Sequence, residues 1–184
     1  MLPPFHADAQ TIRPALRAEM KSWHRGCPVP PRSLRLLRLS YVGFDGRART
    51  GRLIVHADAV VAVRRALRSL YAARFPIRQM RLIDAYDGDD DRSMAADNTS
   101  AFNCRRAAGS AHWSAHAYGR AIDINPRENP MILGGHAYPA NARRSGPGVI
   151  RGGDVVVRAF SRAGWSWGGR WTSPDYQHFS ASGG

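Results

Sequence analysis

One stretch, residues 114–126 with the sequence SAHAYGRAIDINP, constrains the chain more than any other. It places His116 and Asp123 seven residues apart, and imidazole nitrogen and carboxylate oxygen are both good ligands for zinc. Gly119 between them predicts a turn, because glycine bends the backbone without a Cβ penalty. The residues after Gly119 indicate the start of a strand. The spacing therefore predicts one ligand from a loop and a second ligand from the strand that follows it.

Two ligands are too few for a metal site, and the candidate for the third lies near the C-terminus. His178 would complete a His/Asp/His set and leave the fourth position for water, as in catalytic zinc sites. Asp175 lies three residues earlier, and residues i and i+3 of an extended strand face opposite sides. A bend is therefore needed if both side chains serve one site, and Pro174 indicates irregular backbone there.

The pattern S-x-H-x-x-G-x-A-x-D, followed by a late D-x-x-H, resembles the zinc peptidases of bacterial cell walls. The resemblance extends from about Gly26 to Phe179 and includes residues 98–105 and 165–171. It implies a Hedgehog/DD-peptidase-like fold with zinc on the sheet. It also implies hydrolysis of peptidoglycan stem peptides, and we favour a D-alanyl-D-alanine carboxypeptidase. An L-alanyl-D-glutamate endopeptidase of the phage endolysin type and a non-catalytic, zinc-containing cell-wall binding module are the alternatives.

The resemblance assigns roles to individual residues. His116, Asp123 and His178 would bind Zn²⁺, which polarises the scissile carbonyl and lowers the pKa of its water. Asp175 would act as general base and then as general acid. Arg105 would hold the substrate carbonyl and its developing oxyanion, a task that suits a fixed guanidinium. The adjacent Arg106 competes for that role, but strand alternation lets only one of the two face zinc.

Other side chains are candidates for substrate contacts. Ser114 would hydrogen-bond substrate or brace His116, and it lacks the His/Asp pair that would make it a nucleophile. Trp165, Trp167 and Trp171 would wall the cleft, with packing in the core as an equal alternative. Of the three tryptophans, Trp165 is our predicted substrate contact.

The net charge of the chain indicates which partners it could bind. The 27 Lys and Arg residues exceed the 14 Asp and Glu residues by 13, and Lys21 is the only lysine. Such a surface favours polyanions, although a codon bias toward Arg explains the composition equally well. Neither an RNA-binding module nor zinc-finger spacing supports nucleic acid. We therefore expect a monomer that binds stem peptides, with anionic cell-wall polymers as possible partners and no specific nucleic acid.

The two cysteines and the hydropathy of the chain indicate where the protein is located. Cys27 and Cys104 could form a disulfide, which would fit an extracellular setting, or could both stay free. No stretch approaches the roughly 20 apolar residues of a membrane helix. Residues 1–20 lack the basic-then-apolar pattern of a signal peptide. We expect an extracellular or cell-wall-associated protein whose signal is missing from this sequence or which leaves the cell by another route.

The remaining pattern predicts an α+β domain with a small antiparallel sheet and flanking helices. Residues 1–25 are expected to form a leader that contains a helix over residues 9–23, and residues 26–184 are expected to form the zinc peptidase domain. Strands are predicted over residues 34–44, 52–56, 80–86, 100–105, around Asp123 and over 175–179. Asp45-Gly46 predicts a hairpin turn between the first two strands. Helices are predicted after the N-caps Asp58 and Asp154, and the first of them carries an apolar stripe of Val60, Val63, Leu67, Leu70 and Tyr71.

Two loops stand out. The acidic segment of residues 87–91 lacks the full EF-hand pattern, so we interpret it as a solvated loop rather than a calcium site. Residues 125–153 are rich in Pro, Gly and Asn. This segment is too long for a plain connection, and we predict an irregular functional loop over the cleft.

Overall fold

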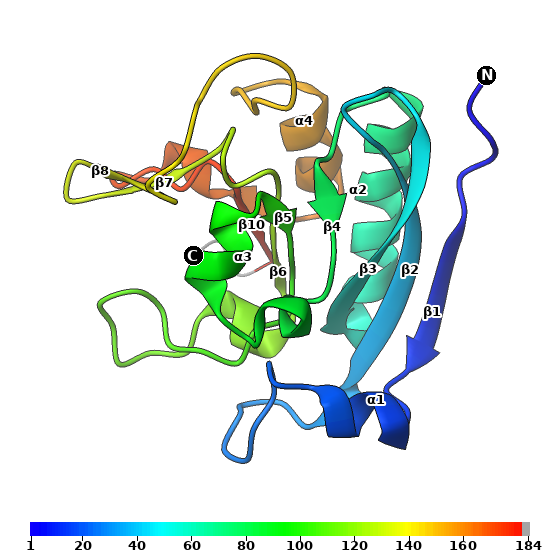
Figure 1. The fold of residues 1–184 in the computed structure, drawn as a ribbon, viewed down its shortest axis with the longest axis vertical. Helices are drawn as coiled ribbons and strands as arrows, with labels where there is room; N and C mark the ends of the chain where they lie inside the picture. The colour runs from blue at the N-terminus through cyan, green and yellow to red at the C-terminus, as the bar shows by residue number, and fades with distance from the viewer. Residues whose placement is uncertain (182–184) are drawn as a thin grey trace.

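The computed structural model describes residues 1–181. Within that range the protein has a mixed α/β architecture of four small sheets and four α-helices (Figure 1). The first sheet has the order β1-β2-β3 and consists of β1 (Ala7–Thr11), β2 (Leu34–Val42) and β3 (Ala48–His56). The second has the order β6-β10-β9 and consists of β6 (Ala121–Asp123), β9 (Ser166–Trp167) and β10 (His178–Ser180). Two-stranded sheets are formed by β4 (Gln79–Met80) with β5 (Asn98–Thr99), and by β7 (Met131–Leu133) with β8 (His136–Tyr138). The β4–β5 pair is parallel, so the expectation of one antiparallel sheet is only partly met.

The β2–β3 hairpin confirms the predicted turn at Asp45-Gly46. Pairing runs from Leu34 opposite His56 to Val42 opposite Ala48, so the returning strand begins four residues earlier than expected. Gly46 adopts a left-handed φ of 74°, the conformation that favours glycine.

Two helices build the main core against this hairpin. The predicted apolar stripe of α2 (Val60–Ala72) is buried, whereas Asp58 is not its N-cap. Asp58 lies in the short 3₁₀ helix η2 (Ala57–Ala59), where its carboxylate pairs with His56 and Arg120 instead. In contrast, Asp154 does cap α4 (Val155–Arg162), because its Oδ1 accepts hydrogen bonds from the two backbone N–H groups at residues 156 and 157.

The core also reaches the second sheet, which carries the candidate site. Phe160 of α4 stacks on Phe179 of β10 with ring centroids 4.4 Å apart, and both side chains are completely buried. Ile122 of β6 lies opposite Phe179 and is equally buried. This packing anchors the two strands on which Asp123 and His178 lie.

The N-terminal segment differs from the prediction. The expected helix over residues 9–23 is confined to α1 (Pro14–Glu19), because proline favours the first turn of a helix and keeps the preceding residue extended. Residues 7–11 form β1 and pair with β2 from Ala7 opposite Leu39 to Thr11 opposite Arg35. The predicted leader therefore contributes a strand to the first sheet, and the boundary at residue 25 stays a prediction.

Two predicted strands do not form as expected: the strand over residues 80–86 is reduced to β4, and the strand over residues 100–105 was wrong, since β5 ends at Thr99. After β4 the chain turns into the 3₁₀ helix η3 (Ile83–Tyr86). After β5, residues 101–105 run between elements rather than along one strand. Three backbone N–H groups here donate to the carbonyls of three different segments: Phe102 to Ile54, Asn103 to His116 and Cys104 to Ser22. Among residues 1–181, none of the helices combines the length and apolar character that a membrane crossing requires.

Cys27 and Cys104 form a disulfide, which decides between the two alternatives left open by the sequence. The bond joins residues 77 apart in the chain and ties the segment after α1 to the segment that carries Arg105. It lies beside a second apolar cluster that includes Met20, Leu34 and Phe102.

Replacing both cysteines by serine should lower the free energy of unfolding by about 2–5 kcal/mol, because a long loop is then no longer closed in the unfolded chain. Urea titration followed by circular dichroism would measure the change. Wild-type protein kept in reductant is the matched control and should unfold at the midpoint of the double variant. Coincident midpoints for the oxidised protein and the variant would contradict this prediction.

Candidate metal centre

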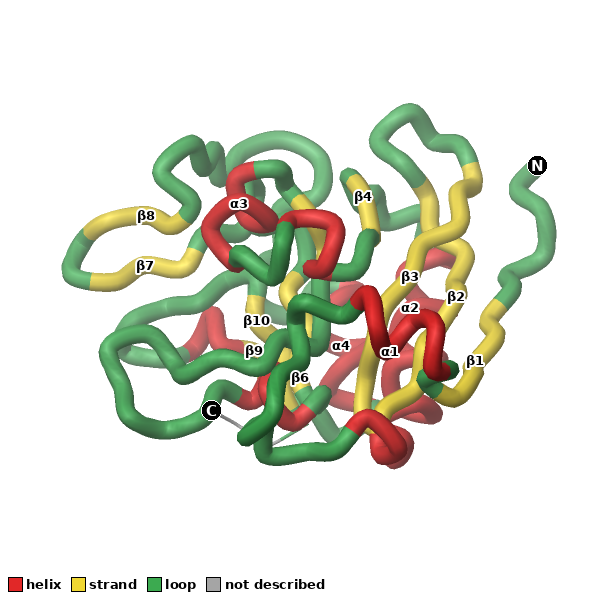
Figure 2. The backbone as a smooth tube through the Cα atoms, turned by 60° about the horizontal axis from the view of Figure 1, so that its bottom comes forward, coloured by secondary structure: helices red, strands yellow, loops and turns green. Residues whose placement is uncertain are grey.

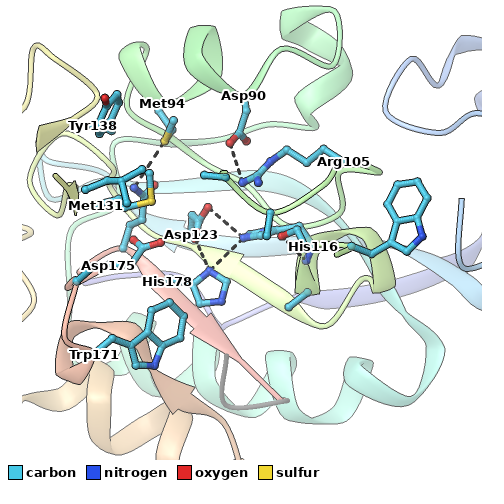
Figure 3. Close-up of a pocket in the computed structure, with 18 of the residues that line it drawn as sticks. Asp90, Met94, Arg105, His116, Asp123, Met131, Tyr138, Trp171, Asp175 and His178 are labelled. Carbon is cyan, nitrogen blue, oxygen red and sulfur yellow. Dashed lines mark hydrogen bonds and ion pairs between the residues drawn. The ribbon is translucent and has the colours of Figure 1, made fainter. Parts of the chain in front are cut away.

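Three side chains far apart in the sequence converge at the edge of the second sheet (Figure 3). In the register of β6 with β10, Asp123 lies directly opposite His178, so their side chains share one face. His178 Nδ1 is 3.1 Å from Asp123 Oδ1. His116 Nε2 is 3.1 Å from Asp123 Oδ2 and 3.2 Å from His178 Nδ1. All three residues are at least 94% buried, and they could hold a metal ion.

His116 enters from the short 3₁₀ helix η4 (Ala115–Tyr118) directly before β6. Ser114 caps this helix, and its hydroxyl accepts a hydrogen bond from the His116 backbone N–H. Gly119 ends the helix with a left-handed φ of 66°, which confirms the predicted turn at this residue. A Cβ at Gly119 would lie 2.6 Å from the backbone nitrogen of His56, so only glycine fits at this turn.

The donor atoms are oriented by their surroundings. His116 Nδ1 contacts the carbonyl oxygen of Ala101, so the ring donates its Nδ1–H there and directs Nε2 toward Asp123 and His178. Burial lowers the pKa of His178, which favours the neutral imidazole that binds metals. Burial opposes ionisation of Asp123, but the charge of His116 and hydrogen bonds from both imidazoles outweigh it and lower the pKa of this carboxyl.

The geometry fits a small tetrahedral cation. Nitrogen and oxygen ligands bind zinc at about 2.0–2.1 Å, so two ligands of a tetrahedral ion lie roughly 3.3 Å apart. The observed separations of 3.1 and 3.2 Å are close to that value. Two neutral imidazoles and one carboxylate are also a donor set that suits zinc.

The three donors line a cavity of about 990 Å³. The β7–β8 hairpin borders it with Met131, Ile132, Leu133 and Tyr138, so the long segment of residues 125–153 does lie beside the cleft. In Figures 1 and 2 the hairpin lies on the opposite side of the second sheet from β1–β3. The expectation of irregular structure is met over most of the segment and was wrong at the hairpin, where Gly134 and Gly135 both adopt positive φ and close a two-residue turn. The Gly134-Gly135 pair is a sequence signal for a two-residue hairpin turn, and the prediction overlooked it.

Asp175 and His178 both face the cavity because the chain bends between them. The His178 backbone N–H donates to the Asp175 carbonyl, and β10 therefore begins at His178 rather than at Asp175. The Asp175 N–H donates to the carbonyl of Gly168, where an added Cβ would lie 2.8 Å from the Asp175 carbonyl oxygen. This close approach fixes the backbone of Asp175.

The carboxyl group of Asp175 points toward Asp123 and His178 in Figure 3. Its Oδ1 is buried and has no hydrogen-bond partner within residues 1–181. Burial raises the pKa of Asp175 well above its usual range, and the negative charge of Asp123 raises it further. A carboxyl group whose pKa is raised in this way is a stronger base than an ordinary aspartate.

Of the two adjacent arginines, the structure places Arg105 in the wall of the cavity. Its guanidinium forms an ion pair with Asp90, with 2.7 Å between the nitrogen and the carboxylate oxygen. Arg106 instead lies over the ring of Trp113, 3.8 Å from its centroid, and donates to the carbonyl of Ala111. The oxyanion role of Arg105 stays a prediction.

The predicted substrate contact at Trp165 does not agree with its position. Trp165 is only 5% exposed, packs on Phe160 in the core and is not among the described residues that line the cavity. Trp171 lines the cavity instead, and its ring centroid is 5.2 Å from that of His178. Ser114 also lines the cavity and braces His116, while a substrate contact for its hydroxyl stays a prediction.

Sequence reasoning missed the contribution of the acidic segment. Asp89 caps α3 (Asp90–Ala95), and from this helix Asp90 and Met94 reach the cavity. The segment is thus the beginning of a helix rather than a solvated loop. Asp89 is the sequence signal for this helix, because an aspartate at the N-cap accepts a hydrogen bond from the backbone N–H three residues later. Here that N–H belongs to Arg92. Gln177, 1% exposed, also lines the cavity, and no motif pointed to it.

A buried His/Asp/His group beside a carboxyl of raised pKa defines a site suited to metal-dependent hydrolysis. Residues 108–181 match the family model described as D-alanyl-D-alanine carboxypeptidase. The predicted family resemblance is therefore confirmed over this segment, which contains all three donors and Asp175 but not Arg105. Neither the curated proteins nor the solved structures that were searched gave a match. The family match and the metal-competent group together support a metallopeptidase.

Proposed function

We propose that this protein is a zinc-dependent peptidase that hydrolyses peptidoglycan stem peptides, with D-alanyl-D-alanine carboxypeptidase activity as the specific reaction. The observation that carries the proposal is the convergence of His116, Asp123 and His178 within a segment that matches this peptidase family. A Hedgehog/DD-peptidase-like arrangement of the small sheets is part of the same proposal.

The side chains of the cavity have separate roles in the proposed reaction. When bound by His116, Asp123 and His178, zinc would polarise the scissile carbonyl and make water more acidic. Asp175 takes the proton of the attacking water and delivers it to the leaving amine, for which its raised pKa is suited. Arg105 places a positive charge at the cavity wall, where it stabilises the negative charge that develops on the carbonyl oxygen.

One observation favours L-alanyl-D-glutamate endopeptidase activity as a second candidate. A carboxypeptidase substrate ends in a free carboxylate, which an unpaired cation would bind. Within residues 1–181, both arginines that line the cavity already have carboxylate partners: Arg105 pairs with Asp90, and Arg120 pairs with Asp58. This pairing suits a substrate whose chain continues beyond the scissile bond.

A zinc-containing binding module without activity is the third possibility. The positions of Asp175 and Arg105 argue for the enzyme, because a module that only binds has no use for a carboxyl of raised pKa beside its metal.

Digestion of purified peptidoglycan and of synthetic stem peptides, followed by mass spectrometry, distinguishes these functions. Loss of one terminal D-alanine supports the carboxypeptidase, and a new N-terminal D-glutamate supports the endopeptidase. Protein stripped with a chelator is the control, and it should recover activity when zinc is returned. A protein that holds zinc but cleaves none of these substrates would establish the binding module.

Location and further partners belong to the same proposal. The disulfide supports an extracellular or cell-wall setting, because such bonds persist in oxidising surroundings. A net charge of +13 supports contact with anionic cell-wall polymers. We propose a monomer that acts on stem peptides in this setting.

A further inference from the structure

The ion pair between Asp90 and Arg105 lies in the wall of the cavity. The two groups are 2.7 Å apart, and their side chains are 21% and 30% exposed (Figure 3). Such a pair is shielded from solvent more than a surface ion pair, so its geometry is better defined. The pair joins α3 to the segment that follows β5.

Asp90 is held on a well-anchored element. It is the first residue of α3. The N-cap of this helix, Asp89, accepts a hydrogen bond of 2.9 Å from the backbone N–H of Arg92. Just before the cap, Asp87 forms ion pairs with Lys21 and Arg92. Because aspartate has a short side chain, an anchored backbone places its carboxylate accurately.

Arg105 has few other restraints. One terminal nitrogen donates to the carbonyl of Arg106, its own neighbour, at 3.2 Å. Its buried Nε has no hydrogen-bond partner within residues 1–181, and over the same range Asp90 is its sole ion-pair partner. The orientation of the guanidinium therefore depends on Asp90.

Other carboxylates compete for this guanidinium. Asp123 and Asp175 line the same cavity, and Asp175 Oδ1 lacks a partner within the described chain. An arginine released from Asp90 would be drawn toward these carboxylates by their charge. Asp90 thus decides where the positive charge of Arg105 lies within the cavity.

We propose that Asp90 is a positioning residue, which holds the guanidinium of Arg105 in the orientation that stabilises the developing charge of the substrate and keeps it away from Asp175. This inference rests on the proposed peptidase function. It adds a residue outside the segment that matches the family model.

The test is Asp90→Asn, with Asp45→Asn as the control. Asp45 lies in the β2–β3 turn and also pairs with an arginine, Arg49, but it is not among the described residues that line the cavity. Asp90→Asn should lower kcat about 10- to 100-fold, as expected for a displaced catalytic group, with zinc content unchanged. Asp45→Asn should stay within about twofold of the wild-type rate, and Asp90→Glu should restore part of the loss.

A double-mutant cycle separates positioning from a structural role. Because Asp90 acts through Arg105, Asp90→Asn should cause no further loss in protein that already carries Arg105→Ala. Additive losses, an unchanged kcat or a rise in kcat/KM for Asp90→Asn would each overturn the proposal.

A second measurement does not depend on activity. In ¹⁵N-labelled protein, the Arg105 Nη2–H resonances, assigned by their absence in Arg105→Ala, should be protected from exchange in wild-type protein and in Asp45→Asn, because this nitrogen pairs with Asp90. Asp90→Asn should remove that protection. If protection persists in Asp90→Asn, the positioning role is overturned, whether or not the protein is active. If the wild-type protein cleaves no stem peptide, the proposed peptidase function is overturned instead.

Discussion

Replacing Asp175 by asparagine is expected to slow stem-peptide hydrolysis by about two to four orders of magnitude, the usual cost of losing a general base. Asparagine preserves the size of the side chain but cannot take a proton from water. The substitution removes a carboxyl group whose pKa is raised and whose buried Oδ1 has no hydrogen-bond partner within residues 1–181. Single-turnover rates measured by mass spectrometry would show the loss.

The same variant should keep its metal, because Asp175 is proposed not to bind it. Metal content measured by atomic spectroscopy should match that of the wild-type protein. Asp45→Asn, in the β2–β3 turn, is the matched control and should keep both rate and metal. Hydrolysis at the wild-type rate by Asp175→Asn would refute the proposed mechanism.

Replacing His116 or His178 by alanine should have the opposite signature, with metal content falling from about one equivalent per chain to nearly none and activity lost with it. Each substitution removes one of three protein donors that lie 3.1–3.2 Å apart, and the remaining two hold zinc poorly. Elemental analysis of protein purified without added metal measures the change.

The exposed His6→Ala is the control for this pair and should retain its metal. Circular dichroism must show that the ligand variants are folded, since both histidines are buried. If both folded variants keep one equivalent of zinc, the assignment of the ligands is wrong.

Several local features of this protein follow from the sequence alone. The apolar spacing of α2, the Asp154 cap of α4 and the turn at Gly119 all appear as predicted, because each depends on residues a few positions apart. The His/Asp/His set was also predictable, since its residue types restrict the chemistry. The glycine pair of the β7–β8 hairpin was equally local, and its signal was missed.

Only the tertiary structure decided which distant segments meet. Asp123 lies opposite His178 because of the register of two three-residue strands, which their own sequences specify weakly. Three tryptophans could have lined the cavity. Trp165 and Trp167 are buried in the core, where they pack on Phe160 and Phe179, and Trp171 lines the cavity instead. The Asp90–Arg105 pair likewise needs α3 to lie beside residues 101–105. Such contacts depend on how the whole core packs, and residue spacing along the chain carries little information about them.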